Sequence, residues 1–329
     1  MRMVMQIKNE CIGSVLGVLA VLLFVFSTFG ILSIPFYVFC LFALFFCLIL
    51  ILFSAVRAIS RNELNYFHAA ALVLLIFTII SHSMQIFLPE TSFDALWYHL
   101  PSVQAYVMNN KLSYDSTLYQ TLYPQYGDLF FMIGYGLKGV TGARFISFLF
   151  FLLLMHITFL SLRSKLKFST SLLGVLTVAL FQVVSWQSST VYVDLISTVF
   201  FLWSLYSLIR FQATQRQAFL FQSALCSGVF FGVKFINLGF FPLVFLISLG
   251  LLWKSKSFLF FWALTLAVAF PWYLRSWWYS GSLMYPIGTT YAEPVIKQMG
   301  VSGWNEWLLL RFTHIWQLPA EFFLHSDGY

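Results

Sequence analysis

Residues 12–32 read IGSVLGVLAVLLFVFSTFGIL, a stretch without a charged side chain. A helix of about 20 apolar residues is long enough to cross the hydrocarbon core of a bilayer, which is about 30 Å thick. Apolar runs of similar length recur along the whole chain. We expect an all-α fold, a polytopic transmembrane helical bundle of about nine spans, at residues 12–32, 35–56, 68–88, 143–162, 169–186, 195–211, 218–235, 236–253 and 257–277.

The composition excludes an ordinary soluble domain. Of the 329 residues, 60% are hydrophobic, 20% are aromatic and only 9% are charged, whereas a soluble domain carries about 25% charged residues. The formal net charge of +7 comes from Lys and Arg scattered at the ends of apolar runs, so no nucleic-acid partner is expected. The four cysteines lie inside apolar runs without CxxC spacing, which argues against a disulfide framework or a zinc site.

Basic residues set the expected orientation, because they concentrate in the cytoplasmic loops of membrane proteins. The nine spans place five basic clusters on one side: Arg2/Lys8, Arg57/Arg61, Arg163/Lys165/Lys167, Arg210/Arg216 and Lys254/Lys256. We therefore expect a cytoplasmic N-terminus and an external chain end. Of the 11 acidic residues, only Glu10 and Glu63 fall on the cytoplasmic side, which agrees with this orientation.

Three regions follow from this map. Residues 1–66 form an N-terminal two-span hairpin, residues 67–277 a transmembrane core, and residues 278–329 an external C-terminal segment. The core includes a long external loop, 89–142, and loops of this length are often functional. Within it, Asp128–Gly139 (DLFFMIGYGLKG) is too short to span, so we expect a short helix at the outer interface.

The external loop begins PETSFDALWYHLP and carries acidic residues directly after the third span. We expect a short helix that Pro101 ends, with Glu90 and Asp94 four residues apart on one face. Two carboxylates at a membrane surface can act as a general base towards a hydroxyl or hold a divalent ion. The alternative is a pair of solvated helix-start acids stabilised by the dipole. Asp115 and Asp128, further along the loop, are expected to have no role.

The same loop is rich in tyrosine and contains one histidine. Tyr98 and Tyr123 could stack on a sugar ring of a substrate, whereas tyrosines at a membrane interface more often form an aromatic belt. His99 could bind or exchange a proton with a substrate near neutral pH, and the alternative is a hydrogen-bonded structural residue.

Charged residues also stand at the ends of later spans. Asp194, in QSSTVYVDLI, opens the sixth span, and acids at membrane depth are costly and tend to be functional. Lys234 and Arg275 lie at the outer ends of apolar runs, against the orientation rule. Two cations beside several carboxylates would suit a phosphate, and snorkelling to lipid headgroups is the alternative. Lys138 and Arg144 lie near the same face and compete for that role.

Taken together, these segments resemble a known family. FDALWYHLPSVQAY followed by YPQYGDLFF resembles the first external loop of the GT-C membrane glycosyltransferases. The branch that it resembles is the bacterial set related to dolichyl-phosphate-mannose protein mannosyltransferases and aminoarabinose transferases. SSTVYVDLISTVFFL, GVKFINLGFFP and PWYLRSWWYSGSLMYPIG resemble later segments of that branch in order and spacing, so the resemblance covers residues 80–290.

The resemblance implies a GT-C type bundle in a bacterial inner membrane. It also implies an inverting transferase that moves a sugar from a polyprenyl-phosphate donor to a glycan, lipid or protein acceptor at the outer face. By motif, Asp94 would be the catalytic acid residue, and Glu90 would supply the partner that an adjacent acid supplies in many relatives. Asp194 would be a second acidic site residue, and Lys234 and Arg275 would contact phosphate. The cofactor expected is a divalent cation, Mg or Mn, held at Asp94.

Two features depart from that branch. The first two spans have no counterpart in it, and the chain ends at Tyr329, soon after the last matched segment, so we expect a short or truncated member. Two other functions stay open: a transporter or flippase of lipid-linked saccharides, and a catalytically inactive membrane scaffold. A transporter should bury charged residues within its spans to line a pathway, whereas the charges here lie near the ends of the expected spans.

Overall fold

The structure is a computed structural model, and it describes residues 2–58, 66–253 and 256–285. Every regular element within these ranges is a helix, so the all-α prediction is confirmed for the described part of the chain. The helices are α1 (Arg2–Thr28), α2 (Ile34–Ala58), α3 (Tyr66–Gln85), η1 (Ala95–His99), α4 (Leu100–Asn109), η2 (Tyr119–Leu122), α5 (Tyr126–Arg163), α6 (Phe168–Leu180), α7 (Gln182–Gln187), α8 (Asp194–Thr214), α9 (Gln217–Phe231), η3 (Phe235–Phe240), α10 (Phe241–Leu252) and α11 (Lys256–Ser280).

The apolar runs of the sequence form the helices of a membrane protein. Among the described residues, four segments are long and apolar enough to cross a bilayer: Tyr126–Arg163, Asp194–Thr214, Phe235–Leu252 and Lys256–Ser280. Five shorter apolar helices accompany them: Ile12–Thr28, Ile34–Leu50, Ala69–Gln85, Phe168–Leu180 and Gln217–Phe231. Each expected span falls on one of these helices, while the number of spans stays a prediction.

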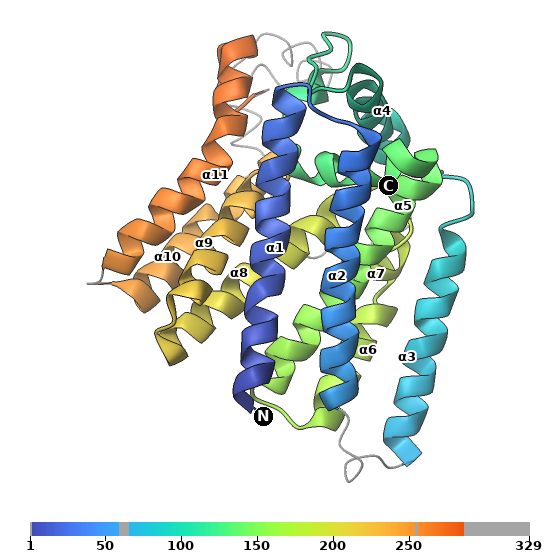
Figure 1. The fold of residues 1–329 in the computed structure, drawn as a ribbon, viewed down its shortest axis with the longest axis vertical. Helices are drawn as coiled ribbons and strands as arrows, with labels where there is room; N and C mark the ends of the chain where they lie inside the picture. Colours follow the sequence, from blue (N-terminus) through green and yellow to red (C-terminus); the bar gives the residue numbers. More distant parts are fainter. Residues whose placement is uncertain (1, 59–65, 254–255, 286–329) are drawn as a thin grey trace, which may run out of the picture. The chain divides into compact units, whose positions relative to one another are not determined.

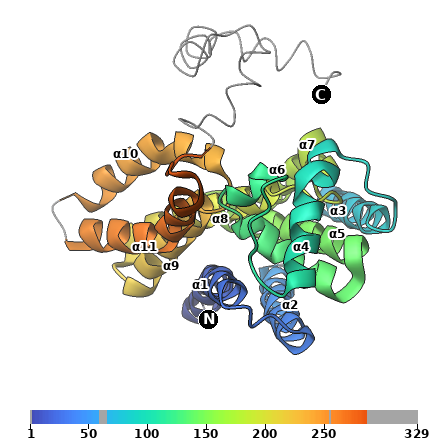
Figure 2. The same ribbon diagram turned by 90° about the horizontal axis from the view of Figure 1, so that it is seen from above.

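The chain divides into two compact units, Met1–Trp272 and Tyr273–Tyr329. In the first unit, α8 packs between α5 and α9, α1 packs against α9, and α2 packs against α5 (Figures 1 and 2). The helix α6 joins α3 to this group by packing against both α3 and α5. The predicted division at residues 66 and 277 stays a prediction, and residues 286–329 of the expected external segment lie outside the described residues.

Loops between distant helices meet at one end of the first unit. The amide of Leu112, in the loop after α4, donates to the carbonyl of Ser27 at the end of α1 (2.8 Å). The hydroxyl of Ser189, in the loop before α8, donates to the side-chain oxygen of Gln85 at the end of α3 (3.1 Å). Figure 1 shows α4 at this end, with the N-terminus and the turn between α5 and α6 at the opposite end. The basic α5–α6 turn and the N-terminus thus share one end, as the sequence predicts.

The short helix expected at Asp128–Gly139 is present, and its position relative to the outer interface stays a prediction. These residues form the start of α5, and Leu129–Ile133 are fully buried inside the protein. Residues 129–133 carry no polar side chain, and a helix without a polar face packs in a core. The chain then turns at Lys138 and Gly139, where Gly139 has a φ of +59° that favours glycine.

Gly134, before this turn, and Gly142, after it, allow the two parts of α5 to approach each other closely. A Cβ on either glycine would fall inside contact distance of the carbonyl of the other. The clash is with backbone on both sides, so it could be relieved only by moving one helix away from the other. Small residues serve this purpose wherever membrane helices approach closely.

We expect Gly134→Ala to destabilise the protein by about 3 kcal/mol, the upper part of the range for overpacked cores. Thermal unfolding of the purified protein in nanodiscs, followed by circular dichroism, would measure the loss. Gly250→Ala is the matched control, because no atom lies within 4 Å of a Cβ built at this helical glycine. Equal melting temperatures for Gly134→Ala and the wild type would contradict the close approach.

Candidate active site

Asp94 lies in the first turn of a helix that continues through η1 and α4. The expectation that Pro101 ends this helix is wrong. Proline lacks an N–H and crowds the preceding helical turn, and here that turn is widened into a π helix, in which the Leu100 amide donates to the Ala95 carbonyl. Glu90 precedes the helix, so the expectation that Glu90 and Asp94 share one helix face is also wrong.

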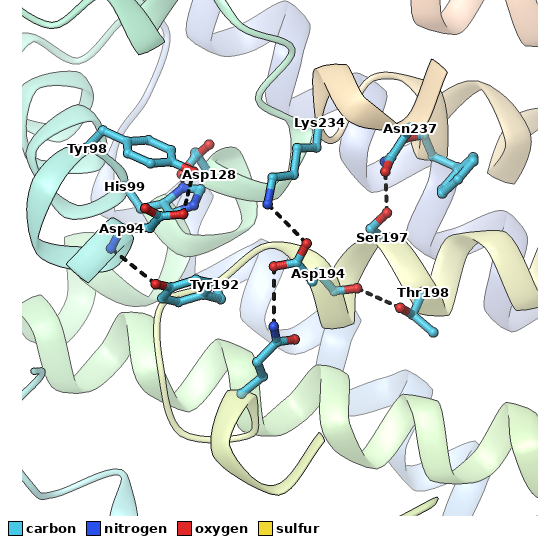
Figure 3. A network of polar contacts seen from close by, with 12 residues as sticks. Asp94, Tyr98, His99, Asp128, Tyr192, Asp194, Ser197, Thr198, Lys234 and Asn237 are labelled. Atoms are coloured by element: carbon cyan, nitrogen blue, oxygen red, sulfur yellow. Dashed lines mark hydrogen bonds and ion pairs between the residues drawn. The ribbon is translucent and has the colours of Figure 1, made fainter. Parts of the chain in front are cut away.

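Asp94 is partly exposed and has two tyrosine partners (Figure 3). The hydroxyl of Tyr98 donates to Asp94 Oδ2 (3.3 Å), and the Asp94 amide donates to the hydroxyl oxygen of Tyr192 (3.1 Å). Burial raises the pKa of Tyr98, and the negative charges of Asp94, Asp128 and Asp194 raise this pKa further. Tyr98 therefore stays protonated at neutral pH, and three carboxylates gather around it.

His99 and Asp128 form a buried pair beside Asp94. His99 Nδ1 lies 2.6 Å from Asp128 Oδ1, and each side chain is only 3% exposed. The Tyr98 ring lies over the His99 ring with 4.1 Å between centroids. A carboxylate at Nδ1 fixes the orientation and tautomer of an imidazole, and His99 Nε2 is buried without a hydrogen-bond partner in the described part of the chain. Asp128, which is expected from the sequence to have no role, lies in α5 and holds His99.

Asp194 and Lys234 form the other half of the site. Asp194 is the first residue of α8, where the helix dipole favours a negative charge. Lys234 occupies the extended break between α9 and η3, and its Nζ lies 3.1 Å from Asp194 Oδ1. Gln187 donates to the other oxygen, Asp194 Oδ2 (3.3 Å). Asn237 donates to the Ser197 hydroxyl (2.8 Å), which ties the segment after Lys234 to α8 (Figure 3).

Glu90 and Arg144 lie deeper than the sequence suggests. Glu90 is 2% exposed and Arg144 is 5% exposed as side chains, and Arg144 Nε lies 3.8 Å from Glu90 Oε2. Arg144 Nε also donates to the carbonyl of Ser189. Arg144 is therefore engaged within the protein, and the expectation that it competes for an external phosphate is not supported by its position.

The remaining predicted residues lie elsewhere. Tyr123 belongs to a row of rings in which Tyr119 lies 6.3 Å from Trp97 and 5.9 Å from Tyr123, between centroids. Arg275 lies in the second compact unit, with its guanidinium carbon 5.6 Å from the centroid of the Tyr279 ring. The roles of Tyr123 and Arg275 in substrate binding stay predictions.

The predicted divalent cation finds few protein ligands. No group of three or more His, Cys, Asp or Glu side chains is placed to hold a metal within the described residues. Magnesium can be held by one or two carboxylates together with substrate phosphates, so a divalent cation at Asp94 stays a prediction. We assign no chemical step to it.

Sequence reasoning missed Tyr192, Gln187 and Asp128. A signal for Asp128 existed, since YGDLFFMI surrounds the acid with apolar residues and buried acids need a partner. No comparable signal marked Tyr192 or Gln187.

Comparisons of the chain with protein-family models, with curated proteins and with solved structures found no match.

Proposed function

We propose that this protein is a membrane glycosyltransferase that moves a sugar from a polyprenyl-phosphate donor to a cell-envelope acceptor. One observation carries the proposal: Asp94, the His99–Asp128 pair and the Asp194–Lys234 pair gather at one end of a bundle of apolar helices. A base, a cation and aromatic rings in one place are what sugar transfer from a phosphate needs. The resemblance to GT-C glycosyltransferases rests on the same segments of sequence.

The proposed reaction is a single displacement. Asp94 takes the proton of the acceptor hydroxyl, and the hydroxyl oxygen forms a bond to the anomeric carbon of the donor sugar. The bond from that carbon to the phosphate oxygen breaks on the opposite face, so the configuration inverts. Polyprenyl phosphate leaves with the electron pair. The Lys234 ammonium turns from Asp194 to the phosphate and stabilises the negative charge that the phosphate gains. Lys234 is 28% exposed and Asp194 is 39% exposed as side chains, which leaves the ammonium accessible to a phosphate.

The proposed location is the outer face of a bacterial inner membrane. A GT-C type bundle of about nine spans with a cytoplasmic N-terminus would put the basic α5–α6 turn inside and α4 outside, and Asp94 lies one turn before α4 in the same continuous helix. Lipid-phosphate sugars reach such a site from within the bilayer. Transport of a lipid-linked saccharide has less support, because Asp94, Asp194 and Lys234 stand at helix ends rather than along a path through the spans.

The test is reconstitution of the purified protein in liposomes. Polyprenyl-phosphate sugars with a radiolabelled sugar would be offered with an envelope fraction from cells that lack the gene. We expect labelled sugar in the envelope fraction, an equal amount of released polyprenyl phosphate, and an inverted anomeric centre by nuclear magnetic resonance. Label that crosses the bilayer while still attached to lipid, without released polyprenyl phosphate, would establish transport instead. No reaction with any donor of the panel would overturn the proposal.

A further inference from the structure

Both carboxylate oxygens of Glu90 accept hydrogen bonds from backbone amides. Its Oε1 accepts hydrogen bonds from the amides of Thr91 and Ser92, both at 3.0 Å. Its Oε2 accepts a hydrogen bond from the amide of Val191 (3.0 Å) and faces Arg144 at 3.8 Å. With both oxygens engaged and the side chain 2% exposed, Glu90 is out of reach of an acceptor hydroxyl.

The segment that Glu90 holds, residues 189–193, has little regular structure of its own. It is attached to its neighbours through individual side chains: Ser147 donates to the Thr190 carbonyl, Arg144 donates to the Ser189 carbonyl, and Ser189 donates to Gln85. Glu90 completes this set by accepting the hydrogen bond of the Val191 amide. An irregular segment held in this way depends on each bond for its position.

Both halves of the active site connect to this segment. Tyr192, the next residue after Val191, receives the amide hydrogen bond of Asp94 (3.1 Å). Asp194 follows two residues later and pairs with Lys234 (3.1 Å). A change at Glu90 is therefore transmitted to Asp94 and to Asp194 through the backbone of the segment.

We propose that Glu90 is a positioning residue, which places Asp94 and the Asp194–Lys234 pair by holding residues 189–193, with Arg144 as its buried counter-charge. This assignment rests on the proposed transferase function for its catalytic consequence. It replaces the expectation from the sequence that Glu90 is a catalytic partner of Asp94. A proton acceptor or metal ligand would have to face the substrate, and Glu90 faces the protein.

The first test is Glu90→Gln. The amide keeps the size of the side chain, but its NH₂ group cannot accept a backbone N–H and Arg144 loses its counter-charge. We expect transfer to fall about 10-fold, the equivalent of one lost hydrogen bond. Because Glu90 acts in part through Asp94, Glu90→Gln should cause a smaller loss in an Asp94→Asn background than in the wild type. A general folding defect would lower transfer by the same factor in both backgrounds and would overturn the proposal.

The second test does not depend on catalysis. Hydrogen exchange of the purified protein in nanodiscs should show faster exchange in the peptide containing Val191 and Tyr192 for Glu90→Gln. Arg144→Gln should also speed exchange in this peptide, because it removes the hydrogen bond from Arg144 to the Ser189 carbonyl. Asp115→Asn is the control, because Asp115 is a partly exposed carboxylate that accepts hydrogen bonds from Thr117 within its own loop. Unchanged exchange in Glu90→Gln would overturn the proposal. If the wild-type protein transfers no sugar but Glu90→Gln exchanges faster, only the transferase function would be refuted.

Discussion

Asp94→Asn is expected to lower sugar transfer by about 10²–10⁴, the usual contribution of a general base. The amide of asparagine keeps the shape of the side chain and still accepts the hydrogen bond from Tyr98. The backbone amide of residue 94 still donates to Tyr192, so the fold should persist. What is lost is a group that accepts a proton near neutral pH.

Steady-state transfer by the reconstituted protein would measure this effect, with circular dichroism to show that the variant is folded. Asp115→Asn removes a carboxylate from the same loop. Hydrogen bonds from Thr117 lower the pKa of Asp115, so this control also removes a full negative charge at neutral pH. It should retain wild-type transfer. Full transfer in Asp94→Asn would show that another residue is the base, and Asp194 would become the better candidate.

The helices of this protein could be predicted because run length and hydropathy are local properties. The break between the seventh and eighth expected spans was also predicted, from Asn237 and Gly239 near its position and the Lys254/Lys256 pair beyond it, and the structure places it between α9 and η3. The errors arose where tertiary packing decides. The close approach of Gly134 and Gly142 within α5 is one such feature, which no local pattern predicts.

The sequence predicted that the site residues share one end of the bundle, and it did not predict their contacts. Asp94, Asp194 and Lys234 were all expected at outer ends of spans, and the structure brings Asp194 and Lys234 to 3.1 Å. The pairing of His99 with Asp128 and the burial of Glu90 were not predictable, because both depend on how the loop folds over α5 and the segment before α8. Spacing along the sequence suggested a shared face for Glu90 and Asp94, and the late start of the helix at Phe93 removed it.

Lys234 should contribute nearly as much as Asp94, through charge rather than proton transfer. It stands in the extended break between α9 and η3, held by Asp194 on one side. When the donor binds, its phosphate competes with Asp194 for the ammonium, and the phosphate gains charge as the sugar leaves. A cation at this position therefore stabilises the transition state more than it stabilises the bound donor.

Lys234→Met is expected to lower transfer by about 10²–10³, by analogy with the loss of one donor to a developing oxyanion. The fold should tolerate the change, because Asp194 is 39% exposed and keeps the hydrogen bond from Gln187. Donor binding, measured by titration of a polyprenyl-phosphate sugar, should weaken in Lys234→Met but not in Asp194→Asn, where the ammonium loses its competing carboxylate. Lys165→Met is the charge-matched control, since Lys165 is exposed in the turn between α5 and α6. Wild-type affinity and rate in Lys234→Met would mean that this lysine only closes an ion pair or reaches lipid headgroups, and the phosphate contact would have to be sought at Arg275.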